Sequence, residues 1–302
     1  MKPLLICVVG PTAIGKTNLA IELAKAFNTE IISADSRQFY KEMTIGTAVP
    51  TSEELAAAPH HFIQNKSIFE SFTVGDFERE ALLKLDELFK KHPVVILVGG
   101  SGLYVDAVTN GLDNFPEVSS LIRQELQNVL TNHGIEVLQN ELKAADPEYY
   151  KKADIQNPHR IIRALEIIRG TGRPFSSFLK KKSVARKFRT EYIGIKADRP
   201  IVYERINKRV DLMMQSGLLS EAKELYPHRE VNALQTVGYK ELFAYLDGEY
   251  PLETAVSEIK KNTRRFAKRQ GTWFRKNDAI RWFEAPVAVS DVLAVLKKQK
   301  TP

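Results

Sequence analysis

The chain has 302 residues, of which 43% are hydrophobic and 27% charged, and its formal net charge is +7. This composition excludes a disordered chain, and at about 150 residues per domain the length suggests two domains. The single cysteine, Cys7, excludes an internal disulfide and favours a reducing compartment. No apolar stretch approaches the roughly 20 residues that cross a bilayer, and no signal-peptide pattern is present. We therefore expect a cytoplasmic protein that does not associate with membranes.

The basic residues are concentrated in two segments. Residues 260–281 contain nine Lys or Arg and a single acid, a net charge of +8 that leaves −1 for the rest of the chain. Residues 180–189 add six basic residues and no acid. Clustered Lys and Arg release counterions when they meet phosphates, so this pattern favours a polyanionic partner over a merely solvated helix face.

The N-terminal third alternates short apolar runs with helical patterns, which is typical of βαβ units and a parallel sheet. We expect strands at residues 4–9, 30–34 and 93–98, and helices at residues 16–27 and 77–91. Each expected strand is followed by glycine or by a short polar residue, as the turns of such a sheet require.

The pattern then changes to polar amphipathic helices between residues 114 and 189. We expect this segment to be a helical insertion domain within a core domain formed by residues 1–113 and 190–302. A strand at residues 191–197 should return to the sheet, and everything beyond residue 199 is predicted to be helical.

A glycine-rich motif lies between the first strand and the first helix. It matches G-x-x-x-x-G-K-[ST] and consists of Gly10, Pro11, Thr12, Ala13, Ile14, Gly15, Lys16 and Thr17. Backbone N–H groups and a helix N-terminus can cradle phosphates there, Lys16 adds a positive charge, and the Thr17 hydroxyl can bind Mg²⁺, the cofactor we expect. The expected fold class is therefore α/β, a P-loop NTPase-like core with a parallel sheet flanked by helices, plus an inserted all-helical domain.

Two strand ends refine this expectation. The strand at residues 93–98 is followed by Gly99 and Gly100 rather than by the acid that holds Mg²⁺ in nucleotide hydrolases, so hydrolysis is not predicted. Asp35 follows the second strand, at the edge where α/β sheets collect their ligands. Its carboxylate can serve as a general base, as a Mg²⁺ ligand through water, or as a cap for the following turn.

Motifs along nearly the whole chain resemble those of the bacterial tRNA dimethylallyltransferase family. They are the phosphate loop and the segments DSRQFY at 35–40, MTIGTA at 43–48, GGSGLY at 99–104, NPHRIIRALE at 157–166, VGYK at 237–240 and KRQGTW at 268–273. The resemblance implies transfer of a dimethylallyl group from dimethylallyl diphosphate to N6 of adenosine 37, beside the tRNA anticodon, with release of diphosphate. It also implies a monomer that needs no obligate protein partner.

The resemblance assigns roles to particular residues. Asp35 is the candidate base for the N6 proton, whereas the departing diphosphate is met by the loop N–H groups, Lys16, Mg²⁺ near Thr17, and Arg209. The catalytic set is thus Asp35, Thr17 and Arg209, with Arg209 one helical turn after Arg205. The predicted tRNA-binding residues are Asp35, Ser36, Arg37, Gln38, Ser101, Arg123, His159, Arg160, Arg163, Gly238, Tyr239, Lys240, Lys268, Arg269, Gln270, Trp273 and Arg275.

The basic segment at residues 260–281 is predicted to form a phosphate-binding helix face. Its cations recur at helical spacing, whereas Ile259, Phe266 and Trp273 fall on the other side and are expected to form a buried stripe. The insertion domain, with lysines 180–182 and Arg160, is expected to close over the anticodon stem-loop.

Two other functions stay open at this point. A small-molecule or nucleoside kinase could use the same loop, but it has no need of the basic helix. A non-catalytic RNA-binding protein with a nucleotide switch leaves Asp35 without a role.

Overall fold

The computed structural model describes residues 2–179 and 185–298. The chain divides into two compact units, which we call the core domain (residues 1–110 and 185–302) and the insertion domain (residues 111–184). These limits lie three and five residues from the expected boundaries at 114 and 189. The basic run at residues 180–182 lies outside the described residues.

The first part of the core domain alternates strands with helices. Its elements are β1 (Leu4–Val9), α1 (Lys16–Phe27), β2 (Ile31–Ser33), α2 (Ser52–Ala57), β3 (His60–His61), α3 (Val74–Leu88), β4 (Val94–Gly99) and α4 (Gly102–Asn110). The second part is largely helical, with two further strands. Its elements are β5 (Arg189–Lys196), α9 (Arg199–Gln215), α10 (Leu218–Leu225), α11 (Tyr239–Leu246), α12 (Leu252–Phe274), β6 (Ile280–Glu284) and α13 (Val289–Lys298).

The strands form one parallel sheet in the order β3-β2-β4-β1-β5-β6. The chain crosses from β1 to β2 on one side of the sheet and from β4 to β5 on the other, so β1 and β4 flank the point where the winding direction changes. In such sheets the crevice beyond the carboxyl ends of these strands is where ligands bind. The phosphate loop, Asp35 and Gly100 all follow strands at this edge.

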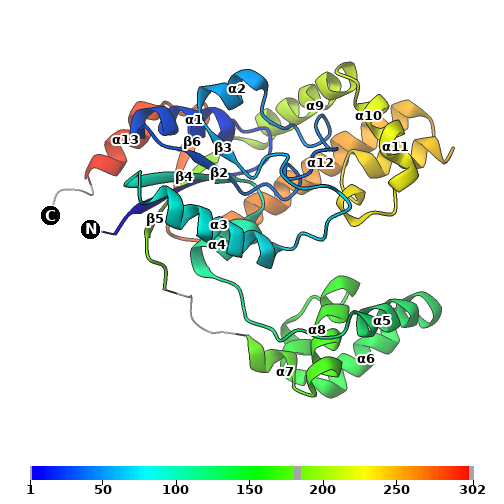
Figure 1. The fold of residues 1–302 in the computed structure, drawn as a ribbon. Helices are drawn as coiled ribbons and strands as arrows, with labels where there is room; N and C mark the ends of the chain where they lie inside the picture. Colours follow the sequence, from blue (N-terminus) through cyan, green and yellow to red (C-terminus); the bar gives the residue numbers. More distant parts are fainter. Residues whose placement is uncertain (1, 180–184, 299–302) are drawn as a thin grey trace. The chain divides into compact units, whose positions relative to one another are not determined.

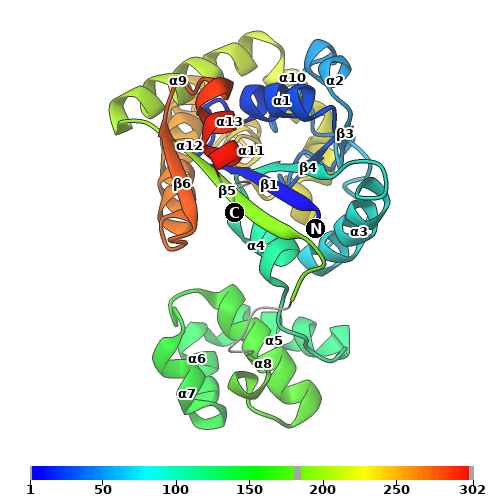
Figure 2. The same ribbon diagram turned by 90° about the vertical axis from the view of Figure 1, so that its left-hand side faces the viewer.

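Both faces of the sheet are covered by helices, which explains why its central strands read as unbroken apolar runs. Ile6 and Val8 of β1 belong to the core cluster that includes α1 and α13, whereas Leu5 and Cys7 belong to the cluster that includes α3 and α4. Figure 2 shows α1 and α13 on one face and α3 and α4 on the other. Cys7 is fully buried, so it fills core space.

Helices α9 to α12 enclose a third core cluster beyond the carboxyl edge of the sheet (Figure 1). Tyr239 and Leu218 lie at its centre without solvent exposure, and Met43 joins it from the loop that follows β2. The loop at residues 43–48 is therefore anchored to these helices.

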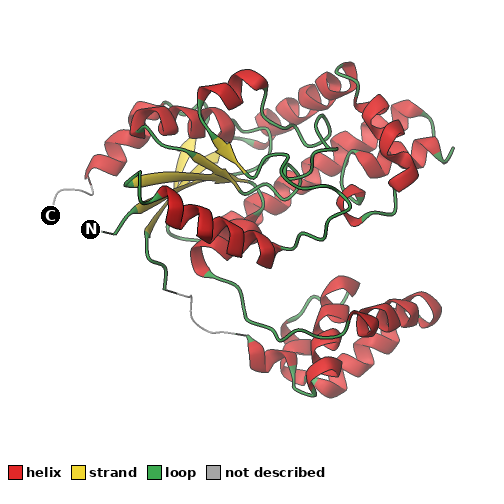
Figure 3. Cartoon of the chain, viewed as in Figure 1, coloured by secondary structure: helices red, strands yellow, loops and turns green. Residues whose placement is uncertain are grey.

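The insertion domain is helical in the part that the structure describes (Figure 3). Its helices are α5 (Ser120–His133), α6 (Ile135–Ala145), α7 (Pro147–Lys152) and α8 (Pro158–Thr171). They have a core of their own, in which Leu126, Leu138 and Leu165 are fully buried. Asn157 caps α8 by accepting a hydrogen bond from the His159 N–H at 3.1 Å.

Three expectations about the elements were wrong. The region beyond residue 199 is not wholly helical, because β6 pairs with β5 at the edge of the sheet. β6 is short, and its pairing partner is about 90 residues away in the sequence. Helix α3 begins at Val74 rather than at residue 77, because Thr73 and Asp76 form a capping box. On α12, Ile259 is buried, but Phe266 and Trp273 are 38% and 39% exposed and so form no buried stripe.

Among the described residues, no helix combines the length and the apolar character needed to cross a membrane.

Candidate active site

The phosphate loop follows β1, whose six residues are all buried, and leads directly into α1. Within it, the Lys16 ammonium donates a hydrogen bond to the Pro11 carbonyl oxygen at 2.7 Å, and Ala13 adopts a left-handed backbone conformation. Burial lowers the pKa of Lys16 to about 8, although the negative charge of Asp35 opposes this shift. The Thr17 side chain lines the same cavity as Lys16, so a hydroxyl oxygen and a cation face one space.

Asp35 lies two residues after β2, and one of its two carboxylate oxygens makes a hydrogen bond to the neighbouring backbone. Its Oδ1 atom accepts a hydrogen bond from the Arg37 N–H at 3.0 Å, which caps the turn. Its Oδ2 atom makes no hydrogen bond to any residue that the structure describes, and the side chain lines two adjoining cavities. The cap and the base considered from the sequence are thus compatible roles for one carboxylate.

Arg209 reaches the site from α9 and lines the same two cavities as Asp35. Its guanidinium donates to the Thr12 hydroxyl at 3.0 Å, and Arg205, one turn earlier, donates to the Ile14 carbonyl at 3.4 Å. Burial lowers the pKa of Arg209 from its ordinary value, and the charge of Asp35 opposes that shift. Two arginines of one helix therefore contact the phosphate loop, and Arg209 places a positive charge near Asp35.

Gly99, the last residue of β4, and Gly100, which follows it, both pack closely against neighbouring groups. A Cβ atom on Gly99 would lie 2.5 Å from the Ala34 carbonyl oxygen, and one on Gly100 would lie 2.4 Å from the Gln270 amide nitrogen. Gln270 itself accepts a hydrogen bond from the Thr12 N–H at 2.9 Å and donates one to the Gly100 carbonyl at 3.0 Å. The buried Gln270 amide thus joins the phosphate loop to the residue that follows β4.

Two adjoining cavities lie at the carboxyl edge of the sheet. The first, of about 460 Å³, is polar and is lined by the phosphate loop, Gln38, Arg205 and part of the loop at residues 43–48. The second, of about 210 Å³, has apolar walls that include Ile206, Met213 and Phe266. Four residues are common to the linings of both cavities: Thr12, Asp35, Thr47 and Arg209.

The comparisons with known proteins agree with this geometry. The IPP transferase family model matches residues 38–277. A tRNA dimethylallyltransferase of Christiangramia forsetii is 63% identical over 284 residues, which cover 94% of each chain. The chain belongs to the IPP transferase family. A second relative, the tRNA dimethylallyltransferase of Flavobacterium psychrophilum, is 55% identical over 298 residues and 97% of each chain.

Solved structures of the family share the fold. The tRNA isopentenylpyrophosphate transferase of Bacillus halodurans is 39% identical, with a TM-score of 0.73 over 99% of this chain and 97% of that one. A eukaryotic dimethylallyltransferase acting on tRNA is 27% identical, with a TM-score of 0.81 over 98% of this chain and 79% of that one. The expected α/β fold with a parallel sheet is confirmed.

Several residues predicted to bind tRNA brace the walls of the site. The Arg37 guanidinium donates to the Ala233 carbonyl at 2.9 Å, and the Gln38 amide donates to the Ala48 carbonyl at 2.8 Å. Ser101 accepts a hydrogen bond from the Ser36 N–H at 3.2 Å, which ties the residues after β2 to those after β4. Arg37, Ser36 and Ser101 line the apolar cavity, whereas Gln38 lines the polar one.

Two residues predicted to bind tRNA are buried instead. Tyr239 has no exposure and Gln270 is 7% exposed, so neither presents its side chain to a ligand on the surface. Gly238, directly before Tyr239, lines the apolar cavity, and Lys240 is exposed. Each of the VGYK and KRQGTW motifs therefore contains two kinds of residue. Some are buried and support the site, and others face solvent.

The other predicted residues on α12 face solvent. Lys268, Arg269 and Arg275 are exposed, and Trp273 packs over Gly102 while its indole N–H donates to Asp106 at 2.8 Å. A long cationic face with an anchored tryptophan is suited to phosphate contacts.

The insertion domain carries the remaining four residues. His159 and Arg160 are exposed at the start of α8. Arg123 and Arg163 both contact the carboxylate of Glu166, which is 6% exposed, at 3.4 Å and 3.0 Å. These arginines therefore have a structural partner within their own domain.

The sequence analysis missed Glu221 on α10. Its carboxylate accepts hydrogen bonds from the N–H groups of Thr44, Ile45 and Gly46 at 3.0, 2.7 and 2.9 Å, and from the Tyr239 hydroxyl at 2.6 Å. It thereby fixes the loop at residues 43–48, which lines both cavities. Only the MTIGTA motif pointed to this loop, and nothing near residue 221 indicated its partner.

Proposed function

We propose that the chain transfers a dimethylallyl group from dimethylallyl diphosphate to N6 of adenosine 37 of tRNA and releases diphosphate. The observation that carries this proposal is the position of Asp35, whose free carboxylate oxygen borders a polar cavity on one side and an apolar cavity on the other. Diphosphate suits the polar cavity beside the phosphate loop, and the prenyl chain and the purine ring suit the apolar walls.

The reaction is a substitution at the first carbon of the prenyl group. The N6 lone pair forms the new C–N bond, the C–O bond to diphosphate breaks, and its electron pair leaves with the diphosphate. Because the lone pair of an exocyclic amine is delocalised into the adenine ring, removal of the N6 proton by the Asp35 Oδ2 atom assists attack. The adenine must first leave the anticodon-loop stack, at a cost of a few kcal/mol.

The negative charge that gathers on the leaving diphosphate determines the roles of the cations. Lys16, Arg209 and the N–H groups of the loop supply fixed positive charge and hydrogen-bond donors where that charge develops. Arg209 is held in place by Thr12, and Arg205 holds the loop itself. Since these groups are fixed before the reaction, little reorganisation is needed as the bond breaks.

The residues present suit Mg²⁺ bound mainly by the substrate. The Thr17 hydroxyl and the Asp35 carboxylate line the polar cavity, and no group of three or more His, Cys, Asp or Glu able to hold a metal occurs among the described residues. Such a sparse donor set matches Mg²⁺, which commonly keeps several waters and binds one or two protein oxygens plus substrate phosphates. When bound, the ion neutralises diphosphate charge, and Thr17 would hold it.

Further features support the proposed partner, location and oligomeric state of the enzyme. The concentrated positive charge of α12 supports tRNA as the partner, and the lone buried cysteine supports a reducing, cytoplasmic location. Each domain has its own core, and all the residues that line the two cavities belong to the core domain. Both features support a monomer that needs no protein partner.

The proposal is tested by incubating the protein with Mg²⁺, unmodified tRNA carrying adenosine 37, and either dimethylallyl diphosphate or ATP. The tRNA is then digested and its nucleosides are analysed by mass spectrometry. We expect prenylated adenosine only with dimethylallyl diphosphate. Consumption of ATP without a prenylated product would replace the proposal with the kinase alternative.

A further inference from the structure

A third hollow lies on the other side of the phosphate loop from the two site cavities. It has a volume of about 290 Å³ and is bounded by the end of β5, the start of α9, the side of α12, and β6. Pro11 is the one residue of the phosphate loop in its lining, and it shares no lining residue with the polar or the apolar cavity. A ligand in this hollow would leave the donor site free.

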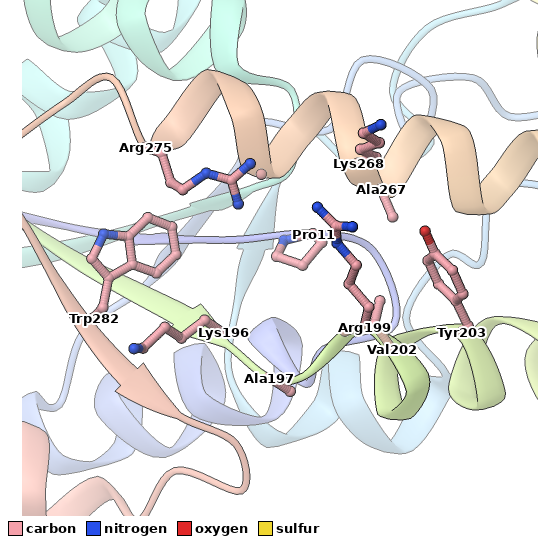
Figure 4. Close-up of a pocket in the computed structure, with 11 residues that line it drawn as sticks. Pro11, Lys196, Ala197, Arg199, Val202, Tyr203, Ala267, Lys268, Arg275 and Trp282 are labelled. Atoms are coloured by element: carbon pink, nitrogen blue, oxygen red, sulfur yellow. The ribbon is translucent and has the colours of Figure 1, made fainter.

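The hollow combines aromatic ends with a cationic middle. Figure 4 shows the Trp282 ring at one end and the Tyr203 ring at the other, with Arg199, Lys268 and Arg275 between them. The floor is apolar and is formed by residues of the loop, α9 and α12, namely Pro11, Val202 and Ala267.

Three of the four cations that line this hollow have no acidic partner among the described residues. Arg199 and Lys268 form no ion pair or side-chain hydrogen bond with any residue that the structure describes, and Arg275 donates only to Thr272 of its own helix, at 3.3 Å. Among the residues that the structure describes, no Asp or Glu lines the hollow, and the fourth cation, Lys196, is paired with Glu284 at 2.9 Å. Three positive charges are thus gathered without compensation around a partly apolar space.

This chemistry identifies the class of ligand. Unpaired Arg and Lys suit a phosphate, and the half-buried Trp282 ring that lines the hollow suits a stacked base, so the combination matches a nucleotide rather than a lone anion or an apolar peptide. The volume of about 290 Å³ lies just below the range usual for ligand sites, roughly 300–1,000 Å³, so the hollow suits no more than a single nucleotide. Lys268 and Arg275 also belong to the cationic segment of α12, so the hollow is continuous with that surface.

We infer that this hollow binds one nucleotide of the tRNA substrate outside the catalytic cavities, with its phosphate on Arg199, Lys268 and Arg275 and its base against Trp282. The inference rests on the proposed action on tRNA and adds Arg199 and Trp282 to the residues that recognise it. Because the hollow is bounded by Pro11, the bound nucleotide would also pack against the outer side of the phosphate loop.

The test compares tRNA affinity in four forms of the full chain: the unaltered protein, Arg199→Ala, Trp282→Leu and the control Lys90→Ala. Lys90 is an exposed cation between α3 and β4, and its side chain forms no hydrogen bond or ion pair with described residues. It precedes a strand, whereas Pro11 and Ala197 of the hollow follow strands, so its loss removes one charge at the opposite edge of the parallel sheet. The dissociation constant for unmodified tRNA is measured by fluorescence anisotropy at several salt concentrations. Thermal melting of each form checks that it is folded.

We expect Arg199→Ala to weaken tRNA binding by about fivefold to tenfold and to reduce the slope of log affinity against log salt by about 0.9, as loss of one phosphate contact requires. Trp282→Leu should weaken binding by about tenfold with the slope unchanged, because stacking is lost but no charge is. Lys90→Ala should match the unaltered protein. Unchanged tRNA affinity and salt slope in Arg199→Ala would overturn the inference.

A second arm separates tRNA from a free nucleotide, using AMP as the probe. Saturable AMP binding that Arg199→Ala abolishes, together with unchanged tRNA affinity, would overturn the assignment to tRNA and indicate a site for free nucleotides. The prenyl-transfer assay on the unaltered protein runs alongside. If that protein prenylates tRNA while Arg199→Ala binds tRNA normally, the inference alone has failed; if it does not prenylate tRNA, the proposed function has failed.

Discussion

The Arg209 guanidinium donates a hydrogen bond to the Thr12 hydroxyl at 3.0 Å, and this contact joins α9 to the phosphate loop over 197 positions of sequence. It fixes a half-buried positive charge where both cavities meet, near Asp35. A base and a cation at the junction of a polar and an apolar cavity are what a transfer reaction with an anionic leaving group needs.

Replacing Arg209 should therefore reduce the chemical step. We expect Arg209→Ala to lower kcat by about 10² to 10³, the range typical for removing one donor to a developing negative charge. Thr12→Val, which keeps Arg209 but removes its anchor, should cause a smaller loss. Single-turnover kinetics of prenyl transfer measure both. An equal loss in the two variants would show that the contact, rather than the charge, matters.

Asp35→Asn should separate catalysis from binding. The amide keeps an oxygen for the Arg37 N–H, so the turn is preserved, but it cannot accept the N6 proton. We expect kcat to fall by about 10² to 10⁴ while the dissociation constant for tRNA stays within about twofold. Rates come from the mass-spectrometric assay and affinities from anisotropy. Normal turnover by Asp35→Asn would remove the base assignment.

Lys16 should impose a pH limit on use of the donor. Its pKa is about 8, so the ammonium is charged below that pH and loses its proton as the pH rises through it. Loss of the charge weakens diphosphate binding by the free enzyme, so kcat/KM for dimethylallyl diphosphate should fall above about pH 8, with a slope that approaches one proton. In Lys16→Arg this fall should be absent at the same pH, because a guanidinium stays charged. A wild-type profile that is flat to pH 9.5 would contradict the assignment.

Local sequence patterns predicted the parts of the site that depend on neighbouring residues. The phosphate loop, α1 at Lys16–Phe27 and the place of Asp35 after β2 all follow from short-range motifs and apolar periodicity. The fold class followed because buried parallel strands alternate with amphipathic helices. These features need no knowledge of how distant segments pack.

Contacts between distant segments could not be predicted in this way. Gln270 reaches Thr12 across 258 positions and Glu221 reaches Gly46 across 175, so each depends on the packing of α12 or α10 against the sheet edge. The edge strand β6 was missed for the same reason, since its pairing with β5 supplies the stability that its five residues lack. The motif around Gln270 was visible, but its burial was not.

Glu221 gives a prediction that tests one of these long-range contacts. Its carboxylate satisfies three backbone N–H groups of the loop at residues 43–48, and the buried Tyr239 hydroxyl donates to it as well. Burial, together with the charge of Glu221, raises the pKa of Tyr239, so this hydroxyl stays protonated and remains a donor. Glu221→Ala should therefore lower the free energy of unfolding by about 1 to 3 kcal/mol, because several donors lose their acceptor.

We expect Glu221→Ala to change the kinetic constants of the site as well as the free energy of unfolding. Thr47 lines both cavities, so a loosened loop should raise KM for the donor and lower kcat. Tyr239→Phe removes only one hydrogen bond to Glu221, so it should lower the free energy of unfolding by only about 1 kcal/mol. The loop would remain held by the backbone contacts of Glu221. Glu224→Gln, an exposed residue on the same helix, is the control. Chemical denaturation and steady-state kinetics provide the two readouts. If Glu221→Ala lost stability but kept both kinetic constants, Glu221 would serve the fold and not the position of the loop.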